Sequence, residues 1–287
     1  MALMTTNWVL LSMTRPPLTR LALTGLRIRY PLKGGRGIEV SELEIGPFGP
    51  EDDRRWMVID PDGSLVTQRE VASLCQIGAT PSVEGLTLTA PNRAPLTLPR
   101  PATGAPSRVV RVWADAVAGI DLGEEGPRWL TEALDRPVRM VYLPADADRR
   151  TDQNYDPSRT RVGYADGYPL LVVGTASLED LNGRRPAPLP MNRFRPNVVV
   201  SGAAPYAEDT WRDFAIGGLP FAGVKPCLRC QVTTTDQATG ARAQEPLRTL
   251  ATYRKDAGGG VRFGMNVVHR DQGRIRIDDA VTVTRTA

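Results

Sequence analysis

The chain is patterned for short β-strands separated by tight turns. Apolar and polar residues alternate between Leu21 and Ile28, and the pattern ends at Pro31. Residues 38–50 repeat the alternation and again end in Gly and Pro, and a Pro-Asp-Gly turn at residues 61–63 separates two further short β patterns. Regular short strands with turn signals between them favour a β-barrel or a β-sandwich.

A few helices interrupt this pattern. Residues 125–135 carry apolar side chains at helical spacing, and residues 245–254 predict another helix. Between them, a buried strand over residues 170–173 precedes a helix for which Thr175 or Ser177 supplies the N-cap. The predicted fold class is therefore mainly β with a few helices (α+β).

The end of the first β set suggests how the chain divides. We expect a flexible lead over residues 1–17, a β-barrel-like domain over residues 18–130 and a second β domain over residues 131–287. Residues 144–158 are rich in Asp, Arg and Pro and predict a mobile loop of the kind that often serves as a lid or a binding loop.

Composition narrows the possible functions. The 36 Lys and Arg residues exceed the 32 Asp and Glu residues only slightly and are spread along the chain, so we expect no nucleic-acid binding. The single histidine, His269, argues against Ser-His-Asp and Cys-His catalysis and against a multi-His metal site. With three cysteines and no long apolar stretch near the start, we expect a cytoplasmic protein that does not bind a membrane.

Cys227 and Cys230 form a Cys-x-x-Cys pair that we expect to lie in a loop leading into a strand over residues 231–235. Structural zinc would need two further ligands, and a thioredoxin-like pair would open a helix after a strand. The remaining interpretations are two buried core residues, or one thiolate acting as a ligand or nucleophile. Lys225 and Arg229 flank the pair and would lower a thiol pKa.

Arginines at two other places could bind an anion. Arg195 precedes Pro196, which predicts an extended conformation for Arg195 and lets its side chain and that of Asn197 reach one ligand. Arg54 lies just before a predicted strand. The ordinary alternative is a set of surface arginines.

Two turns add further candidates. Lys33 stands before Gly34 and Gly35, whose backbone N–H groups could form an anion cradle, although an ordinary hairpin turn has the same sequence. Asp166 lies in a Gly-containing turn before a buried strand, where it is either a turn cap or a catalytic acid.

Taken together, these segments resemble a known family. The sequences YPLKGG, DRRWMVID, NRFRPNVVVSG and KPCLRCQVTTTD occur in the order found in MOSC-domain proteins that carry an N-terminal MOSC β-barrel domain. The resemblance runs from about residue 18 to the C-terminus and is to the branch that includes the mitochondrial amidoxime-reducing component and its bacterial relatives. It implies an N-terminal MOSC β-barrel domain over residues 18–130 and a MOSC domain over residues 131–287.

The resemblance also implies the molybdenum cofactor (Mo-molybdopterin). In the family, a single cysteine thiolate binds the metal beside the dithiolene of the cofactor, and the matching residue here is Cys230. Cys227 matches a neighbouring cysteine of unsettled role, and Asp166 matches an acid near the metal.

Further matching positions are assigned to the cofactor. The residues that match the grip on its phosphate and pterin, together with the glycine beside the lysine, are Lys33, Gly34, Arg54, Arg195 and Asn197. The chain departs from the family pattern at Gly167 and Tyr168, where hydroxyl residues are common. It departs again at Leu228, where a small polar residue is common.

The activity implied by the resemblance is reduction of an N–O bond in a small N-hydroxylated substrate. Because the sequence shows no flavin, haem or iron–sulfur motif, electrons would come from a separate donor protein such as a ferredoxin, a flavodoxin or a cytochrome b5-like protein. Two alternatives remain open: a sulfur carrier that uses a cysteine persulfide, and a non-catalytic molybdopterin-binding module.

Overall fold

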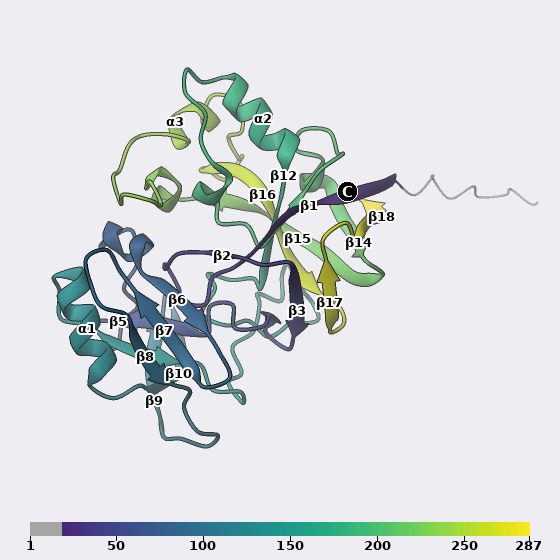
Figure 1. Ribbon diagram of the computed structural model, residues 1–287. Helices are drawn as coiled ribbons and strands as arrows, with labels where there is room; N and C mark the ends of the chain where they lie inside the picture. The colour runs from purple at the N-terminus through teal and green to yellow at the C-terminus, as the bar shows by residue number, and fades with distance from the viewer. Residues whose placement is uncertain (1–18) are drawn as a thin grey trace, which may run out of the picture.

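The computed structural model describes residues 19–287 of the chain. The flexible lead predicted for residues 1–17 lies outside the described residues. The described chain forms two β-rich halves packed side by side, with α1 on one half and α2 and α3 on the other (Figure 1). The predicted mainly β fold is confirmed.

Strands make up most of the described secondary structure. They are β1 (Thr19–Arg29), β2 (Ile38–Glu39), β3 (Glu42–Gly46), β4 (Gly49–Pro50), β5 (Trp56–Ile59), β6 (Gly78–Pro81), β7 (Gly85–Thr89), β8 (Leu96–Pro99), β9 (Ser107–Val112), β10 (Asp115–Asp121), β11 (Arg139–Tyr142), β12 (Leu170–Gly174), β13 (Val198–Val200), β14 (Trp211–Ile216), β15 (Leu219–Arg229), β16 (Val261–His269), β17 (Gly273–Arg276) and β18 (Ala280–Thr286). The α-helices are α1 (Glu125–Leu134), α2 (Thr175–Gly183) and α3 (Leu247–Leu250), and the 3-10 helices are η1 (Ala72–Gln76), η2 (Met191–Arg193), η3 (Ala207–Thr210) and η4 (Gln231–Thr234).

The larger sheet lies in the half of the molecule that carries α2 and α3, which we call the second half; the half that carries α1 is the first half. Its strand order is β13-β12-β16-β15-β14-β18-β1-β2, and β1 also pairs with β13, so the sheet curls back on itself. The pairing of β12 with β13 is parallel, whereas the other named pairings of this sheet are antiparallel. Apolar side chains from opposite walls, including Val172, Phe214 and Met265, fill its interior.

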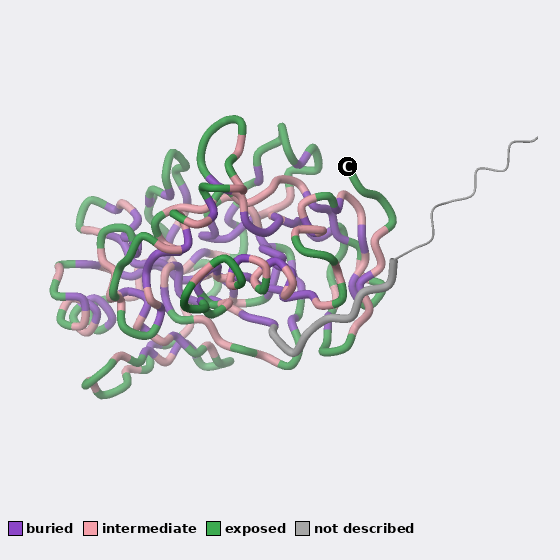
Figure 2. Tube along the Cα trace, turned by 90° about the horizontal axis from the view of Figure 1, so that it is seen from above, coloured by how far each residue is buried: buried purple, intermediate pink, exposed green. Residues whose placement is uncertain are grey.

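The first half is built from smaller sheets. A four-stranded sheet of order β5-β11-β10-β9 and a three-stranded sheet of order β6-β7-β8 share a core with α1. Leu32, Trp56, Leu86 and Leu130 are buried in that core. In Figure 2 the buried trace runs through the middle of the molecule and the exposed trace follows the loops at its edge.

The chain crosses between the two halves more than once. β1 belongs to the large sheet and β3 pairs with β17 near the C-terminus, so early segments of the chain join the second half. β11 follows residue 130 in the sequence but pairs with β5 and β10 of the first half. The domain boundary after residue 130 therefore stays a proposal, because neighbours along the chain are not always neighbours in space.

The predicted helices are found with changed ends. α1 ends at Leu134, and the next residue, Asp135, has the left-handed conformation that commonly terminates a helix. For α2 the N-cap is Gly174, so the predicted cap by Thr175 or Ser177 is wrong. The helix predicted over residues 245–254 shortens to one turn, α3.

The strand predicted over residues 231–235 is wrong as well. Cys227 already lies within β15, which pairs with β16 up to Arg229, and the four residues after Cys230 form η4. The hydroxyl groups of Thr233 and Thr234 donate to carbonyl oxygens three residues earlier, and these local hydrogen bonds favour a helical turn over a strand.

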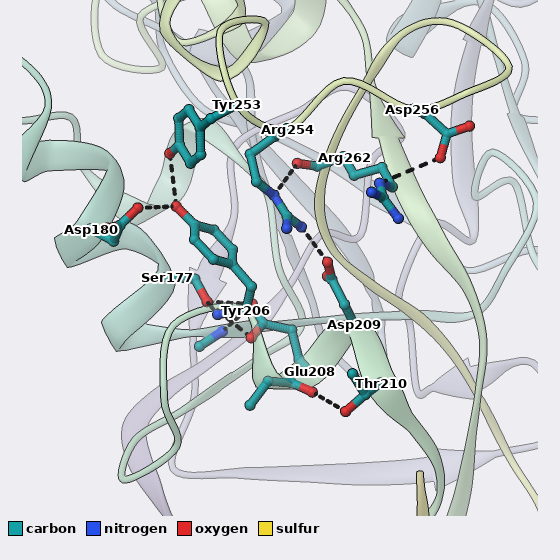
Figure 3. A network of polar contacts seen from close by, with 12 residues as sticks. Ser177, Asp180, Tyr206, Glu208, Asp209, Thr210, Tyr253, Arg254, Asp256 and Arg262 are labelled. Carbon is teal, nitrogen blue, oxygen red and sulfur yellow. Dashed lines mark hydrogen bonds and ion pairs between the residues drawn. The ribbon is translucent and has the colours of Figure 1, made fainter. Parts of the chain in front are cut away.

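A polar network fixes η3 against α2 (Figure 3). The Tyr206 hydroxyl donates to Asp180 at 2.6 Å and lies 2.7 Å from the Tyr253 hydroxyl. The buried Glu208 carboxylate accepts hydrogen bonds from the Ser177 hydroxyl and from the Gly174 N–H at the end of β12. The network therefore ties the end of β12, at Gly174, to η3 through Glu208.

Buried charges hold the long loop over residues 144–158. Asp156 is fully buried and accepts hydrogen bonds from the Thr151 hydroxyl at 2.7 Å and the Thr160 N–H at 2.8 Å. It also pairs with Arg270 at 2.8 Å. Burial alone would raise the pKa of Asp156, but these partners lower it to about 2.

Asp156→Asn should reveal this charge in the pH dependence of stability. Because the pKa of about 2 in the folded chain lies below the unfolded value of about 3.9, the stabilisation is present above about pH 4 and is lost as the pH falls toward 2. We expect urea unfolding of the variant at pH 7 to show a loss of about 1–3 kcal/mol and a flatter pH dependence in that window.

Asp148→Asn is the matched control, because Asp148 lies in the same loop with 71% of its side chain exposed. It should change the free energy of unfolding by less than about 0.5 kcal/mol. Equal effects of the two variants would contradict the role given to Asp156.

Candidate functional site

One cavity between the two halves collects segments from distant parts of the chain. All ten residues predicted for the site line it: Lys33, Gly34, Arg54, Asp166, Gly167, Tyr168, Arg195, Asn197, Leu228 and Cys230. Their roles remain predictions, but their convergence on one cavity is a property of the fold.

The cavity wall is strongly cationic. Its charged side chains are those of Lys33, Arg54, Arg69, Arg195, Arg229 and Asp166. Five cations against one carboxylate leave an excess of four positive charges, which favours an anionic ligand.

Lys33 and Asp166 form an ion pair of 2.6 Å between two distant parts of the chain. Burial lowers the pKa of the Lys33 ammonium, against the opposing effect of Asp166. Shielding by the protein would raise the pKa of Asp166, but 71% of its side chain is exposed. The pairing with Lys33 therefore has the larger effect, and it holds the pKa of the Asp166 carboxyl below its ordinary range.

The backbone around this pair is held firmly. Gly34 has a φ of 81°, and a side chain there would meet the Leu74 side chain 2.6 Å away, so the turn requires glycine. On the other side, the buried Arg149 guanidinium donates to the carbonyl oxygens of Gly163, Ala165 and Asp166. Both partners of the ion pair thus sit on fixed backbone.

Arg54 is oriented by a buried carboxylate that the sequence analysis missed. Asp53 pairs with the Arg54 guanidinium and accepts from the Tyr30 N–H at 2.7 Å and from the Asn197 amide at 3.1 Å. Burial raises the pKa of Asp53, although Arg54 and these donors oppose the rise.

The side-chain amide of Asn197 makes its hydrogen bonds to other groups of the protein. Its oxygen accepts from Arg54 at 3.0 Å and from the Leu171 N–H at 3.2 Å, and its nitrogen donates to Ile28 and Asp53. Asn197 therefore joins β1, β12 and the loop before β5, and its contacts position Arg54.

Arg195 does not have the extended conformation predicted from Pro196. Its φ is 55°, because its N–H closes a turn onto the Asn192 carbonyl after η2. The guanidinium lies 4.2 Å from the centre of the Tyr30 ring and donates to the Gly35 carbonyl at 2.7 Å. Burial lowers the pKa of Arg195 to about 10.

Tyr30 contacts two like charges. The Arg54 guanidinium lies 4.3 Å from the centre of the same ring that contacts Arg195. Contact with an aromatic face stabilises each cation without another carboxylate. The Tyr30 hydroxyl is buried without a hydrogen-bond partner among the described residues, and burial raises the pKa of Tyr30 to about 12.

Cys227 differs from the prediction in its electrostatics. Arg229 donates to its sulfur at 3.0 Å, but burial outweighs this contact and raises the pKa of the Cys227 thiol. The Lys225 ammonium lies 4.0 Å from the centre of the Tyr155 ring. The expected lowering of the pKa is wrong for Cys227.

The two cysteines do not have the setting of a dithiol-exchange pair, which opens a helix after a strand. Cys227, Leu228 and Arg229 belong to β15 and Cys230 has an extended conformation. Both cysteines are free and line the cavity separately.

A metal ion in this cavity would need ligands from a bound group. Over residues 19–287, no three His, Cys, Asp or Glu side chains are grouped to hold a metal ion. A single cysteine can, however, complete the coordination of a metal that arrives with sulfur ligands of its own.

Trp113, Arg69 and Gln68 also line the cavity, from the first half, and were not predicted from the sequence. Trp113 is at a hairpin turn with a φ of 57°, where Gly or Asn is usual, and a bulky residue there costs on the order of 1–3 kcal/mol. The signal in the sequence for a strained turn was a pair of successive β patterns with no Gly or Asn between them.

Two family descriptions match this chain. Residues 159–282 match the MOSC domain, and residues 23–137 match the MOSC N-terminal beta barrel domain. The matched ranges leave residues 138–158, with the loop held by Asp156, between them.

Several full-length relatives are similar to most of the chain. "Mitochondrial amidoxime-reducing component 1" of Homo sapiens is 37% identical over 270 residues, which cover 88% of this chain and 80% of that protein. The protein of the same name from Mus musculus is 39% identical over 78% of this chain and 69% of that protein. "Mitochondrial amidoxime reducing component 2" of Bos taurus is 34% identical over 78% of this chain and 70% of that protein.

These names correct one expectation. The relatives are named as mitochondrial proteins, which contradicts the cytoplasmic location predicted from the sequence. Among the helices of residues 19–287, none has the length and apolar character needed to span a membrane.

Asn197→Ala should destabilise the chain, because it leaves the Ile28 carbonyl and the Leu171 N–H without their side-chain partner. We expect a loss of about 2–4 kcal/mol in the free energy of urea unfolding. Asn192→Ala is the control on the same segment, because Asn192 is exposed, and it should stay within about 0.5 kcal/mol of the parent. A neutral Asn197→Ala would contradict the anchoring role.

Proposed function

The chain belongs to the MOSC family and has that family's N-terminal beta barrel domain, and from this premise we propose that it is a molybdenum-cofactor-dependent oxidoreductase. Its proposed reaction is reduction of the N–O bond of small N-hydroxylated compounds. The observation that carries the proposal is the cavity, which two free thiols, those of Cys227 in β15 and Cys230 just after it, and five cations line together.

The residues present fit a cofactor of this kind. Molybdopterin brings an anionic phosphate and two sulfur ligands, so the protein needs cations and one further soft ligand. The cationic wall and Cys230 supply these groups. Arg229 also has a buried Nε atom without a hydrogen-bond partner among the described residues, which is a donor available for a bound group.

Each residue then has a definite task. Cys230 would bind the metal through its thiolate, and Arg54, Arg195 and Lys33 would hold the anionic part of the cofactor. When bound, the cofactor supplies two-electron redox chemistry. Asn197 and Asp53 contribute by fixing Arg54 in place.

Asp166 would act on the substrate as a carboxylate. Its lowered pKa keeps it ionised at neutral pH, so it can accept a hydrogen bond from an N–H or O–H group of the substrate. Reduction of an N–O bond takes two electrons and two protons and releases water. The Lys33 ammonium pairs with Asp166 at 2.6 Å and has a lowered pKa, and it would donate one of these protons.

The electrons would come from a separate donor protein. This part of the proposal is supported by the absence of flavin, haem and iron–sulfur motifs from the sequence and by the relatives, which are named as components.

Cys230→Ala should remove molybdenum from protein produced in a host that makes molybdopterin. We expect the metal content to fall by about 10-fold or more, whereas Cys227→Ala should keep it. Molybdenum would be measured by elemental analysis beside cyanide-releasable sulfur. Loss of metal in Cys227→Ala alone would refute the ligand assignment, and releasable sulfur on Cys230 without metal would favour a persulfide carrier.

Arg195→Ala should keep the fold and lose the cofactor, because the anionic group would lose a planar two-donor partner. We expect cofactor occupancy to fall by about 10-fold, read as the amount of pterin released on denaturation. Arg159→Ala is the matched control: Arg159 also has a positive φ, 49°, but is exposed. Full occupancy in Arg195→Ala would end this assignment.

A further inference from the structure

Trp113 is a cavity residue that the proposed chemistry does not use. It occupies the two-residue turn between β9 and β10, where Val112 pairs with Asp115. Its φ of 57° places a large aromatic residue in the left-handed region, which such residues seldom adopt. A strained residue that lines a cavity calls for a reason beyond the stability of its hairpin.

Three groups hold the indole over the cavity. Its N–H donates to the Asp166 carboxylate at 3.2 Å, and the Arg69 guanidinium lies 4.5 Å from the centre of the ring. The Lys33 ammonium lies 5.8 Å from the centre of the ring. The ring is therefore fixed to the same carboxylate that the proposed function places beside the reacting group.

The ring still offers apolar surface to the cavity. Trp113 is 43% exposed, and Leu228, on the opposite half of the molecule and two positions from Cys230, is 44% exposed. Exposed apolar side chains on both rims of a cationic cavity provide contacts for the body of a ligand, while the charged groups bind its polar end.

We propose that Trp113 is a specificity-determining residue that contacts a planar, unsaturated group attached to the N–O centre of the substrate. This inference rests on the proposed function and adds a substrate class to it: aromatic amidoximes and related flat N-hydroxylated compounds are preferred over small aliphatic ones. The indole N–H holds the ring at a set distance from Asp166, so the ring positions the substrate's N–O group beside that carboxylate.

The test compares benzamidoxime with acetamidoxime, which carry the same N–O group on a phenyl ring and on a methyl group. Trp113→Gly is the main variant, because glycine suits the positive φ and removes the ring without harming the turn. With cofactor-loaded protein and a chemical electron donor, we expect KM for benzamidoxime to rise by about 3- to 10-fold. The KM for acetamidoxime should change by less than about 2-fold.

Two further variants check the cause. Trp113→Phe keeps an aromatic face and loses the N–H, and it should retain most of the preference for benzamidoxime. Val109→Ala is the matched control on the same hairpin, because Val109 is 72% exposed and does not line the cavity. It should leave both KM values unchanged.

Calorimetric titration of benzamidoxime into the same proteins gives a readout that does not depend on turnover. If Trp113→Gly binds benzamidoxime more weakly than the parent does, but binds acetamidoxime equally well, the inference is supported. This holds even if the parent protein reduces neither compound, because the lack of reduction would refute only the proposed function. If the parent reduces both compounds and the variant changes neither Kd nor KM, or changes both compounds equally, the role of Trp113 is wrong and the proposed function stands. Absence of benzamidoxime binding to the parent overturns the inference.

Discussion

The candidate site depends on bringing several positive charges together in one cavity without mutual repulsion forcing it open. The buried Asp53 carboxylate offsets Arg54, Asp166 offsets Lys33, and the Tyr30 ring contacts both Arg54 and Arg195. Each offset is partial, and the excess positive charge favours an anionic ligand. Arg195 and Asn197 reach this cluster from the half that carries α2 and α3, so the complete site depends on the packing of the two halves.

The same logic explains why so many of the supporting residues are polar and buried. Asn197 makes hydrogen bonds to β1, to β12 and to Arg54 at once, and Arg149 collects three carbonyl oxygens beneath Asp166. A buried polar group is costly unless its partners are in place, so such groups tolerate few alternative arrangements. A metal ligand and an anion grip with fixed geometry require this kind of support.

Local sequence predicted some elements correctly and others wrongly. Helical spacing and a buried apolar run located α1 and β12, whereas the cap of α2 and the strand over residues 231–235 were wrong and the helix over residues 245–254 is shorter than predicted. The conformation of Arg195 could not be read from Pro196, because a hydrogen bond to Asn192 overrides the local preference. The site residues were gathered through resemblance to the MOSC family, and Asp53 and Trp113 were missed because only the folded chain brings them to the others.

The position of β1 has a consequence for how such a protein is made. The first described strand pairs with β18, with Thr19 opposite Val283, so the large sheet is completed by segments from the two ends of the described chain. During synthesis β1 must wait for almost all of the chain before it finds this partner, which raises the contact order and slows folding. A fragment beginning after the first half would also expose the edges of β13 and β18, both of which invite aggregation. We therefore expect the second half to need β1 in order to fold without exposed strand edges.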